Sequence, residues 1–159
     1  MKRNIYADFT YLLILAATFG AVITLGALVA PVVFHNSSLG MEVVVDRYNA
    51  GMMMAEVFHR FSYWLYVVAF YVIIYELYMY KIGQRDTYIF VSSTVVAFTS
   101  LMFSAVYSPK ILVMQELGRE ATQSDTFLAI HKASEFDFKI LAVALLVLFV
   151  RRLMLMRIK

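Results

Sequence analysis

Long apolar runs separated by short polar segments dominate the chain. The three longest, each of 20 residues or more, span residues 9–34, 61–80 and 88–107. Glu76 is the only charged residue in all three. A helix needs about 20 residues to cross roughly 30 Å of hydrocarbon, so each run is long enough to cross a membrane. A fourth apolar run, 140–150, is shorter and is followed by Arg151 and Arg152.

This pattern predicts an all-α integral membrane protein, built as a four-helix up-and-down bundle. The predicted spans are residues 9–34, 57–80, 87–107 and 130–152, joined by outer segments 35–56 and 108–129 within one domain, 1–159. The fourth span reaches back to residue 130 because Arg151 marks its inner boundary and a crossing helix needs about 20 residues.

The connections carry signals for helix starts and stops. The first outer segment reads as helical from about Glu42 and is expected to continue into the second span. Ser108-Pro109 predicts the start of a separate short helix lying at the outer interface, with Ser108 as its N-cap and Gly118 as its stop. Ser124, followed by Asp125, predicts the start of the last helix.

Composition supports a membrane protein. Apolar residues make up 62% of the chain and charged residues 16%, against about 45–50% and 25% in ordinary soluble domains. This excludes a soluble globule and a disordered chain. The sequence has no cysteine, which excludes disulfides and thiolate chemistry. The net charge of +3 is explained by basic residues beside the apolar runs, so we expect no nucleic-acid partner.

Lysine and arginine placement predicts the orientation. With both termini in the cytoplasm, the inner side carries eight basic residues and the outer side six. Lys81 and Arg85 lie in a short inner loop, and Arg151 and Arg152 lie at a helix end, where the positive-inside rule has most force. We therefore predict a multi-pass protein of the cytoplasmic (inner) membrane.

Ionisable residues at the outer ends of the second and fourth spans form the main candidate site. Glu56 and His59 are three residues apart, and His131 and Glu135 are four apart, so each pair shares one helix face. A Glu-x-x-His spacing is used by metal sites in helical bundles. All three histidines (His35, His59 and His131) and the Met52-Met53-Met54 run fall on the predicted outer side, with Met41 and Met114 nearby. Imidazole and thioether ligands suit copper, particularly Cu(I).

Other interpretations of these residues remain open. Arg60 could pair with Glu135 or Asp137 and, with Lys139, form a structural ion network that fixes helix register. A haem held between His59 and His131 is another hypothesis, and proton or solute binding is a third. The charges could also simply reach toward the membrane surface.

Two further features lie within the spans. Ala16, Gly20 and Thr24 recur every four residues, a spacing that lets helices approach closely in lipid. Because a protomer of four helices is small for a pore or a transporter, we also expect a homo-oligomer or a membrane-protein partner. In the second span, Tyr75 needs a hydroxyl partner, for which Thr94, Thr99 or Ser100 are candidates. Glu76 lies near the inner end of that span and is expected to meet Lys81 or Arg85.

Three stretches together carry a family resemblance. They are Gly26 to Phe34 with Pro31 between them, His59-Arg60-Phe61, and Phe127 to Ser134 with His131 between them. They resemble the small four-helix membrane proteins related to transmembrane protein 205, which implies four helices and no defined activity. The Gly26, Pro31 and Phe34-His35 pattern is more distantly similar to the copper-resistance-D and HemJ-type membrane proteins. The HemJ type implies a haem-binding histidine about ten residues before the glycine, where this chain has Ala16.

We therefore predict a non-enzymatic membrane protein that either handles a metal ion, copper first, or serves as an accessory or assembly partner of a membrane complex. The residues expected to carry the metal function are Glu56, His59, His131 and Glu135. The alternative from the enzyme class is a haem-dependent oxidoreductase of the HemJ (protoporphyrinogen oxidase) type.

Overall fold

The computed structural model describes residues 4–34 and 45–157, and these residues form helices and no strands. The first helical stretch consists of α1 (Ile5–Ile23), η1 (Thr24–Val29) and α2 (Ala30–Phe34), and the second is α3 (Arg47–Lys81). The third consists of α4 (Thr87–Met102), η3 (Phe103–Tyr107) and α5 (Ser108–Glu116). A short helix, α6 (Arg119–Thr122), leads into α7 (Asp125–Arg157). The all-helical prediction is confirmed for this part of the chain.

Side-chain caps fix where the helices begin. Asn4 accepts a hydrogen bond from the Tyr6 amide at the start of α1. Asp46 and Asp86 cap α3 and α4 in the same way, accepting from amides three residues on. The Ser124 hydroxyl accepts from the Phe127 amide at 3.2 Å, which confirms the predicted start of the last helix. Each cap satisfies an amide that has no partner within its own helix.

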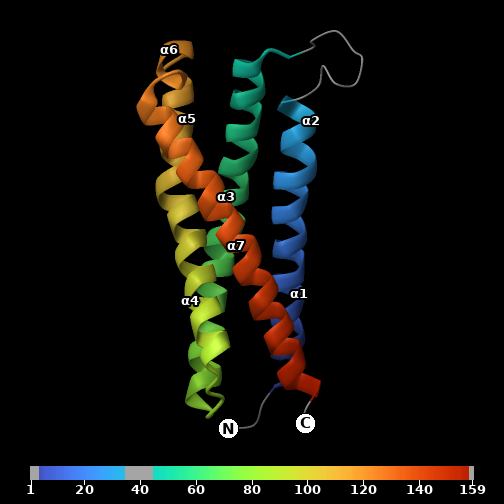
Figure 1. Cartoon of the computed structure of the whole chain (residues 1–159). Coiled ribbons are helices and arrows are strands. Elements are labelled where there is room, and N and C mark those ends of the chain that lie inside the picture. Colours follow the sequence, from blue (N-terminus) through green and yellow to red (C-terminus); the bar gives the residue numbers. More distant parts are fainter. Residues whose placement is uncertain (1–3, 35–44, 158–159) are drawn as a thin grey trace.

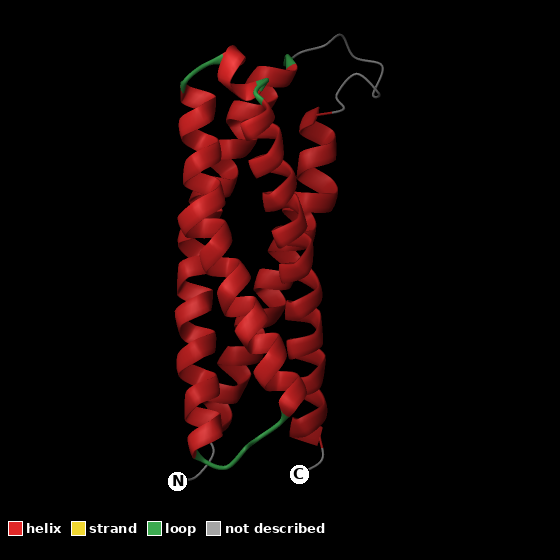
Figure 2. Ribbon diagram, turned by 60° about the vertical axis from the view of Figure 1, so that its left-hand side comes forward, coloured by secondary structure: helices red, strands yellow, loops and turns green. Residues whose placement is uncertain are grey.

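The long stretches lie side by side and alternate in direction, so that both described ends of the chain are at the same end of the molecule (Figures 1 and 2). We call this end the terminal end and the opposite one, where α6 lies, the α6 end. α7 packs against α4 and α1, and α3 also packs against α4 and α1. α3 and α7 are therefore diagonal to each other, and across the centre Phe58 meets Phe138 and Glu76 meets Arg152.

Both prolines of the chain follow a π-helix. Pro31 is the second residue after η1, and Pro109 is the second residue after η3. In an α-helix the proline ring clashes with the carbonyl four residues earlier, and here that residue lies within the wider π turn. The chain thus runs from Thr87 to Glu116 as one 30-residue helix.

This continuity corrects the prediction of a separate interfacial helix beginning at Ser108. Ser108 has α-helical backbone angles and caps nothing, because the helix passes through it. Gly118, with φ of +104°, does stop the helix as predicted, and α3 begins at Arg47 and continues without a break through the predicted second span. Glu42 lies outside the described residues.

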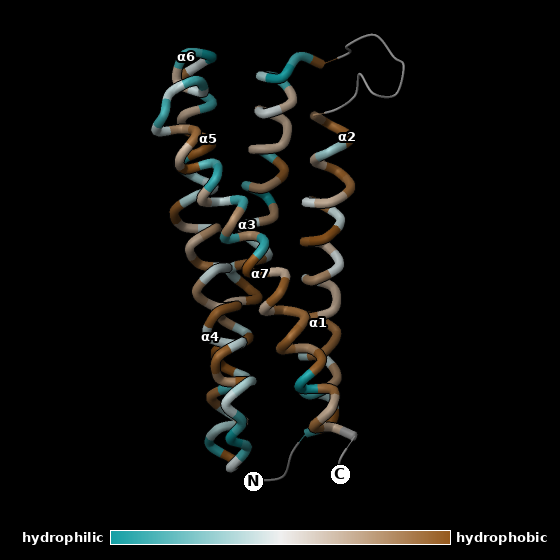
Figure 3. The backbone as a smooth tube through the Cα atoms, viewed as in Figure 1, coloured by the Kyte–Doolittle hydropathy of each residue, from teal (hydrophilic) through white to brown (hydrophobic). Residues whose placement is uncertain are grey.

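Three helices in the described ranges are long and apolar enough to cross a membrane: Ile5–Phe34, Arg47–Lys81 and Thr87–Glu116. Large apolar side chains such as Phe9, Phe70 and Phe98 point outward, whereas Leu65, Leu141 and others fill the interior. Apolar residues dominate the middle of the molecule, and polar residues gather toward its ends (Figure 3). This surface is suited to lipid and indicates a membrane location. α7 is not among these three helices, because charged residues flank its apolar run, residues 140–150, on both sides.

Candidate functional site

The predicted outer site lies at the α6 end, and its residues form same-helix pairs. On α3, Arg60 Nε donates to Glu56 Oε1 at 2.7 Å, and the Tyr63 hydroxyl lies 3.3 Å from His59 Nε2. On α7, His131 Nε2 lies 3.2 Å from Glu135 Oε1. These side chains are largely or partly exposed, so their contacts are worth little to stability.

The two pairs are not brought together. α3 and α7 are diagonal, and no group of three or more metal-ligating His, Cys, Asp or Glu side chains converges among the described residues. The described residues therefore give the predicted copper site no shared ligand set, and a haem between His59 and His131 stays a prediction. His35 and Met41 lie outside the described residues.

The predicted structural ion network is also different from expectation. Arg60 pairs with Glu56 on its own helix and not with Glu135 or Asp137. Lys139 Nζ is 4.0 Å from Glu135, one turn away on α7. Asp137 faces inward, with 8% of its surface exposed, and its Oδ2 atom has no hydrogen-bond partner. Asp137 is thus the one predicted residue in this set that the fold buries.

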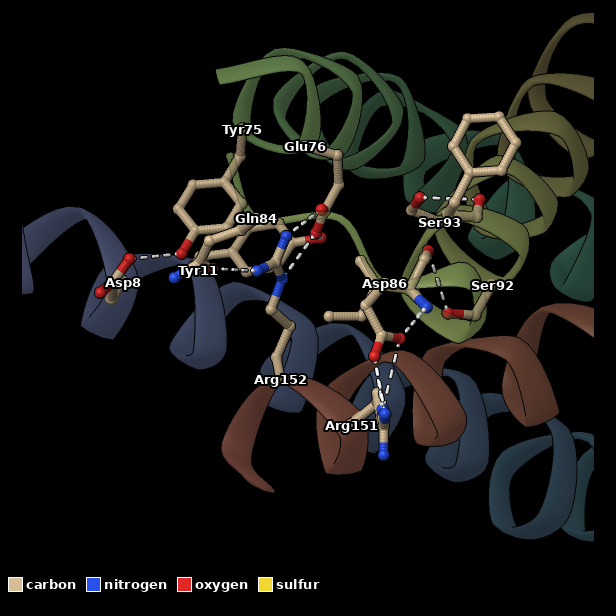
Figure 4. Close-up of polar contacts among 12 residues, drawn as sticks. Asp8, Tyr11, Tyr75, Glu76, Gln84, Asp86, Ser92, Ser93, Arg151 and Arg152 are labelled. Atoms are coloured by element: carbon tan, nitrogen blue, oxygen red, sulfur yellow. Dashed lines mark hydrogen bonds and ion pairs between the residues drawn. The ribbon is translucent and has the colours of Figure 1, made fainter. Parts of the chain in front are cut away.

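A second polar cluster, at the terminal end, is more tightly built. Its members, which we call the terminal-end network, are Asp8, Tyr11, Tyr75, Glu76, Gln84 and Arg152 (Figure 4). They come from α1, α3, the α3–α4 loop and α7, so the network joins elements that are far apart in the sequence. Asp8, Tyr11, Tyr75 and Arg152 are buried.

Two stacked tyrosines form the centre of this network. The rings of Tyr11 and Tyr75 lie 3.8 Å apart and nearly parallel. The Tyr11 hydroxyl donates to Glu76 Oε1 at 2.7 Å, and the Tyr75 hydroxyl donates to Asp8 Oδ1 at 2.5 Å. Each tyrosine of one helix is thereby bonded to a carboxylate of the other, which ties α1 to α3 at their ends.

Arg152 connects α7 to the same carboxylate. Its Nε donates to Glu76 Oε1 at 3.0 Å and its Nη2 donates to Oε2, while Nη1 donates to Gln84 Oε1 at 3.0 Å. The guanidinium also lies over the Tyr75 ring, 5.3 Å from its centre. With 2% of its surface exposed, Arg152 depends on these partners, because an unpaired charge at such a position is costly.

A neighbouring ion pair joins α7 to the start of α4. Arg151 donates from Nε and Nη2 to the Asp86 carboxylate, at 3.1 and 2.6 Å from Oδ2. The hydrogen bond from Arg151 lowers the pKa of Asp86, and the Ile89 amide that Asp86 caps acts in the same direction. Asp86 therefore holds α7 and caps α4 at once (Figure 4).

Sequence reasoning missed this network. Glu76 was expected to meet Lys81 or Arg85, and it meets Arg152 across the bundle. Tyr75 was expected to bond to a hydroxyl of the third span, and it bonds to Asp8. The signal was present, because a lone acid in an apolar helix requires a buried donor. Arg151 and Arg152 were both assigned to the membrane surface, yet adjacent helical residues point about 100° apart, so one of them turns inward.

A family model described as a domain of unknown function (DUF4149) matches residues 13–120 of the chain. Comparisons with curated proteins and with solved structures found no match. The resemblances to proteins related to transmembrane protein 205 and to the copper-resistance-D and HemJ types stay predictions. The matched range covers α3 and all of the α4–α5 helix, and it ends before α7.

Proposed function

The chain belongs to the family described as a domain of unknown function (DUF4149), and from that premise we propose that it is a non-enzymatic accessory or assembly partner of another membrane protein. In this proposal the four helical stretches cross the cytoplasmic membrane as an up-and-down bundle, with both termini in the cytoplasm. The first and last described residues lie at the same end of the molecule, and this placement and the alternating helix directions support the topology (Figure 1). Arg151 and Arg152 at that end agree with the positive-inside rule.

One observation carries the partner role: the most apolar helical stretch is the one least covered by its own chain. Ile5–Phe34 is the most apolar of the three helices long enough to cross a membrane, yet only 17% of its apolar window is buried. The corresponding window of Thr87–Glu116 is 50% buried. The first stretch therefore offers a long apolar face to whatever surrounds the protein.

The shape of that face suits a neighbouring helix. Ala16, Gly20 and Thr24 are exposed along one side of α1 and the start of η1. Small side chains let a second transmembrane helix approach closely enough for backbone contact, and packing of this kind drives association in lipid. A Cβ placed on Gly20 would meet no atom within 4 Å, so the space beside Gly20 lies outside the bundle.

The test replaces Gly20 with leucine. Gly20→Leu should leave the fold intact, because nothing in the chain occupies that space, and should reduce the yield of co-purifying membrane protein at least tenfold. Thr94→Leu on α4 is the matched control, since Thr94 is also exposed on an apolar helix, and it should retain the partner. Two differently tagged copies of the chain in one cell would show whether the partner is a second copy.

If Gly20→Leu yields as much co-purifying membrane protein as the unmodified chain, the proposed contact face is contradicted. Copper bound in stoichiometric amount by the purified protein, and lost in His59→Ala and His131→Ala, would replace the accessory role with copper handling. A Soret band in the purified protein would replace it with the haem oxidoreductase alternative.

A further inference from the structure

The register of α4 and α7, two helices that pack against each other, places Asp137 level with Ser100. The Arg151–Asp86 pair fixes the register of these antiparallel helices, and each of the two residues is 14 positions from that pair, about 21 Å along its helix. Buried residues occur in matching rows on the two helices. The rows are Ile89, Ser93, Val96 and Ser100 on α4, and Leu148, Ala144, Leu141 and Asp137 on α7.

Buried polar groups continue from this level toward the α6 end. Ser100, Ser104 and Ser108 recur every four residues, followed by Gln115, and all four are buried. The Ser104 hydroxyl donates to the Ser62 carbonyl at 3.2 Å, whereas the Ser100 and Ser108 hydroxyls and Gln115 Oε1 have no partner. On α7, the buried Ser134 lies one turn from Asp137 on the same side, and its hydroxyl donates to the His131 carbonyl at 2.7 Å. We call these six residues the polar row.

The interface toward the terminal end is apolar at the next turns. Leu141, Leu145 and Leu148 of α7 have no exposed surface, and neither has Val96 of α4. The hydroxyls of Ser92 and Ser93 are there bonded to carbonyls of their own helix, so they are already satisfied. The interior is therefore polar on one side of Asp137 and closed by leucine on the other.

Among residues 4–34 and 45–157, no cationic side chain forms an ion pair with Asp137. The first helical stretch, α1 to α2, has no titratable side chain between Tyr11 and Phe34, and α4 has none after Tyr88. Titratable groups on the other elements near α7 lie closer to the α6 end: Tyr107 of η3, Lys110 and Glu116 of α5, and Arg119 and Glu120 of α6. On α7 itself, Glu135 is paired with His131 and Lys139, all three exposed or half-buried, and Lys132 is exposed. Across the diagonal, α3 carries His59, Arg60 and Tyr63.

A carboxylate buried without a counter-charge is costly, and it is relieved by taking up a proton. Hydroxyl groups both donate and accept hydrogen bonds, so a row of them can pass a proton to a buried acid. We propose that Asp137 is a proton-binding site in the bundle interior, reached from the α6 end along the polar row and closed off from the terminal end by the leucine side chains.

The first experiment titrates the carboxyl group directly. Infrared spectra of the protein in lipid nanodiscs, recorded as a function of pH, should show the C=O stretch of one protonated, poorly hydrated carboxylic acid. Asp137→Asn should lose that band, and Glu135→Gln, which removes an exposed carboxylate two residues away, should keep it. Carbon-13 label in the aspartate side chains of the unmodified protein should shift the band, so the band is assigned to an aspartate even where Asp137→Asn folds poorly.

A band that is absent from the unmodified protein, that survives in folded Asp137→Asn, or that ignores the aspartate label would overturn the proposal. This experiment needs no orientation of the protein, so its failure is distinct from a failure of the proposed membrane topology.

The second experiment tests access. In vesicles that hold the protein in one orientation, the band should follow the pH on the α6 side and ignore the pH on the terminal side. Leu141→Ser, which places a hydroxyl among the leucine side chains, should make it respond to both. Response of the unmodified protein to the terminal-side pH would contradict the closed inner path.

Discussion

The ion pair between Glu76 and Arg152 provides the sharpest perturbation of the fold. Arg152 is almost completely buried, and its charge is balanced by a carboxylate that also accepts from Tyr11. Glu76→Leu leaves the guanidinium without a counter-charge, and Arg152→Met leaves the carboxylate without one. Either single replacement should destabilise the protein by about 3–5 kcal/mol, because an unpaired charge then stays in the interior.

The double replacement should cost far less than the sum of the two. Independent effects would add to about 6–10 kcal/mol. With both charges gone, the remaining cost is that of the Tyr11 hydroxyl and the Gln84 amide oxygen without partners, about 1 kcal/mol each. The coupling energy between the two positions should thus reach about 4 kcal/mol.

These differences can be measured by unfolding the protein in mixed micelles with a rising fraction of denaturing detergent. The fluorescence of Trp64, the only tryptophan in the chain, monitors the unfolding. The matched control is the exposed Glu56–Arg60 pair, whose side chains are 48% and 77% exposed and whose coupling should stay below about 1 kcal/mol. Additive losses at Glu76 and Arg152 would refute the reasoning.

Two further effects follow from the same geometry. Arg151 lowers the pKa of Asp86 in the folded state, so Asp86 stabilises the fold above the pKa of an unfolded aspartate, and this stabilisation is lost as the pH falls through the folded pKa. Acid should therefore lower the stability of the unmodified protein more than that of Asp86→Asn. The same detergent titration at two pH values would measure this difference. Gly118→Ala should lower the free energy of unfolding by about 1–3 kcal/mol and lower Tm, because φ of +104° is strained for any residue with a Cβ. Gly20→Ala should leave Tm unchanged or slightly raised. Equal Tm values for the two variants would contradict this.

The helices themselves were largely predictable from the sequence. The apolar runs, the stop at Gly118 and the start after Ser124 depend on local composition and backbone preference, and the structure places them as expected. The continuous passage through Ser108-Pro109 was not predictable from the same signals, since Ser-Pro is also a common helix start. A π turn before the proline let the helix continue.

The candidate site was harder to predict because it depends on the order of helices around the bundle. Placing His59 and His131 in one site required the second and fourth helices to be neighbours, and they are diagonal. Periodicity gives the face of each helix but not the helix that covers it. The Arg152 side chain was likewise indistinguishable from a surface charge until α7 was placed against α1 and Glu76.

The central claim is that α7 crosses the membrane and brings both termini to one side. The chain has no cysteine, so single cysteines can be introduced at the exposed positions Thr87, Gln123 and Met154 and tested with a membrane-impermeant maleimide. We expect Gln123→Cys to react in intact cells, and Thr87→Cys and Met154→Cys to react only after permeabilisation. Labelling of Gln123→Cys and Met154→Cys from the same side would contradict the claim.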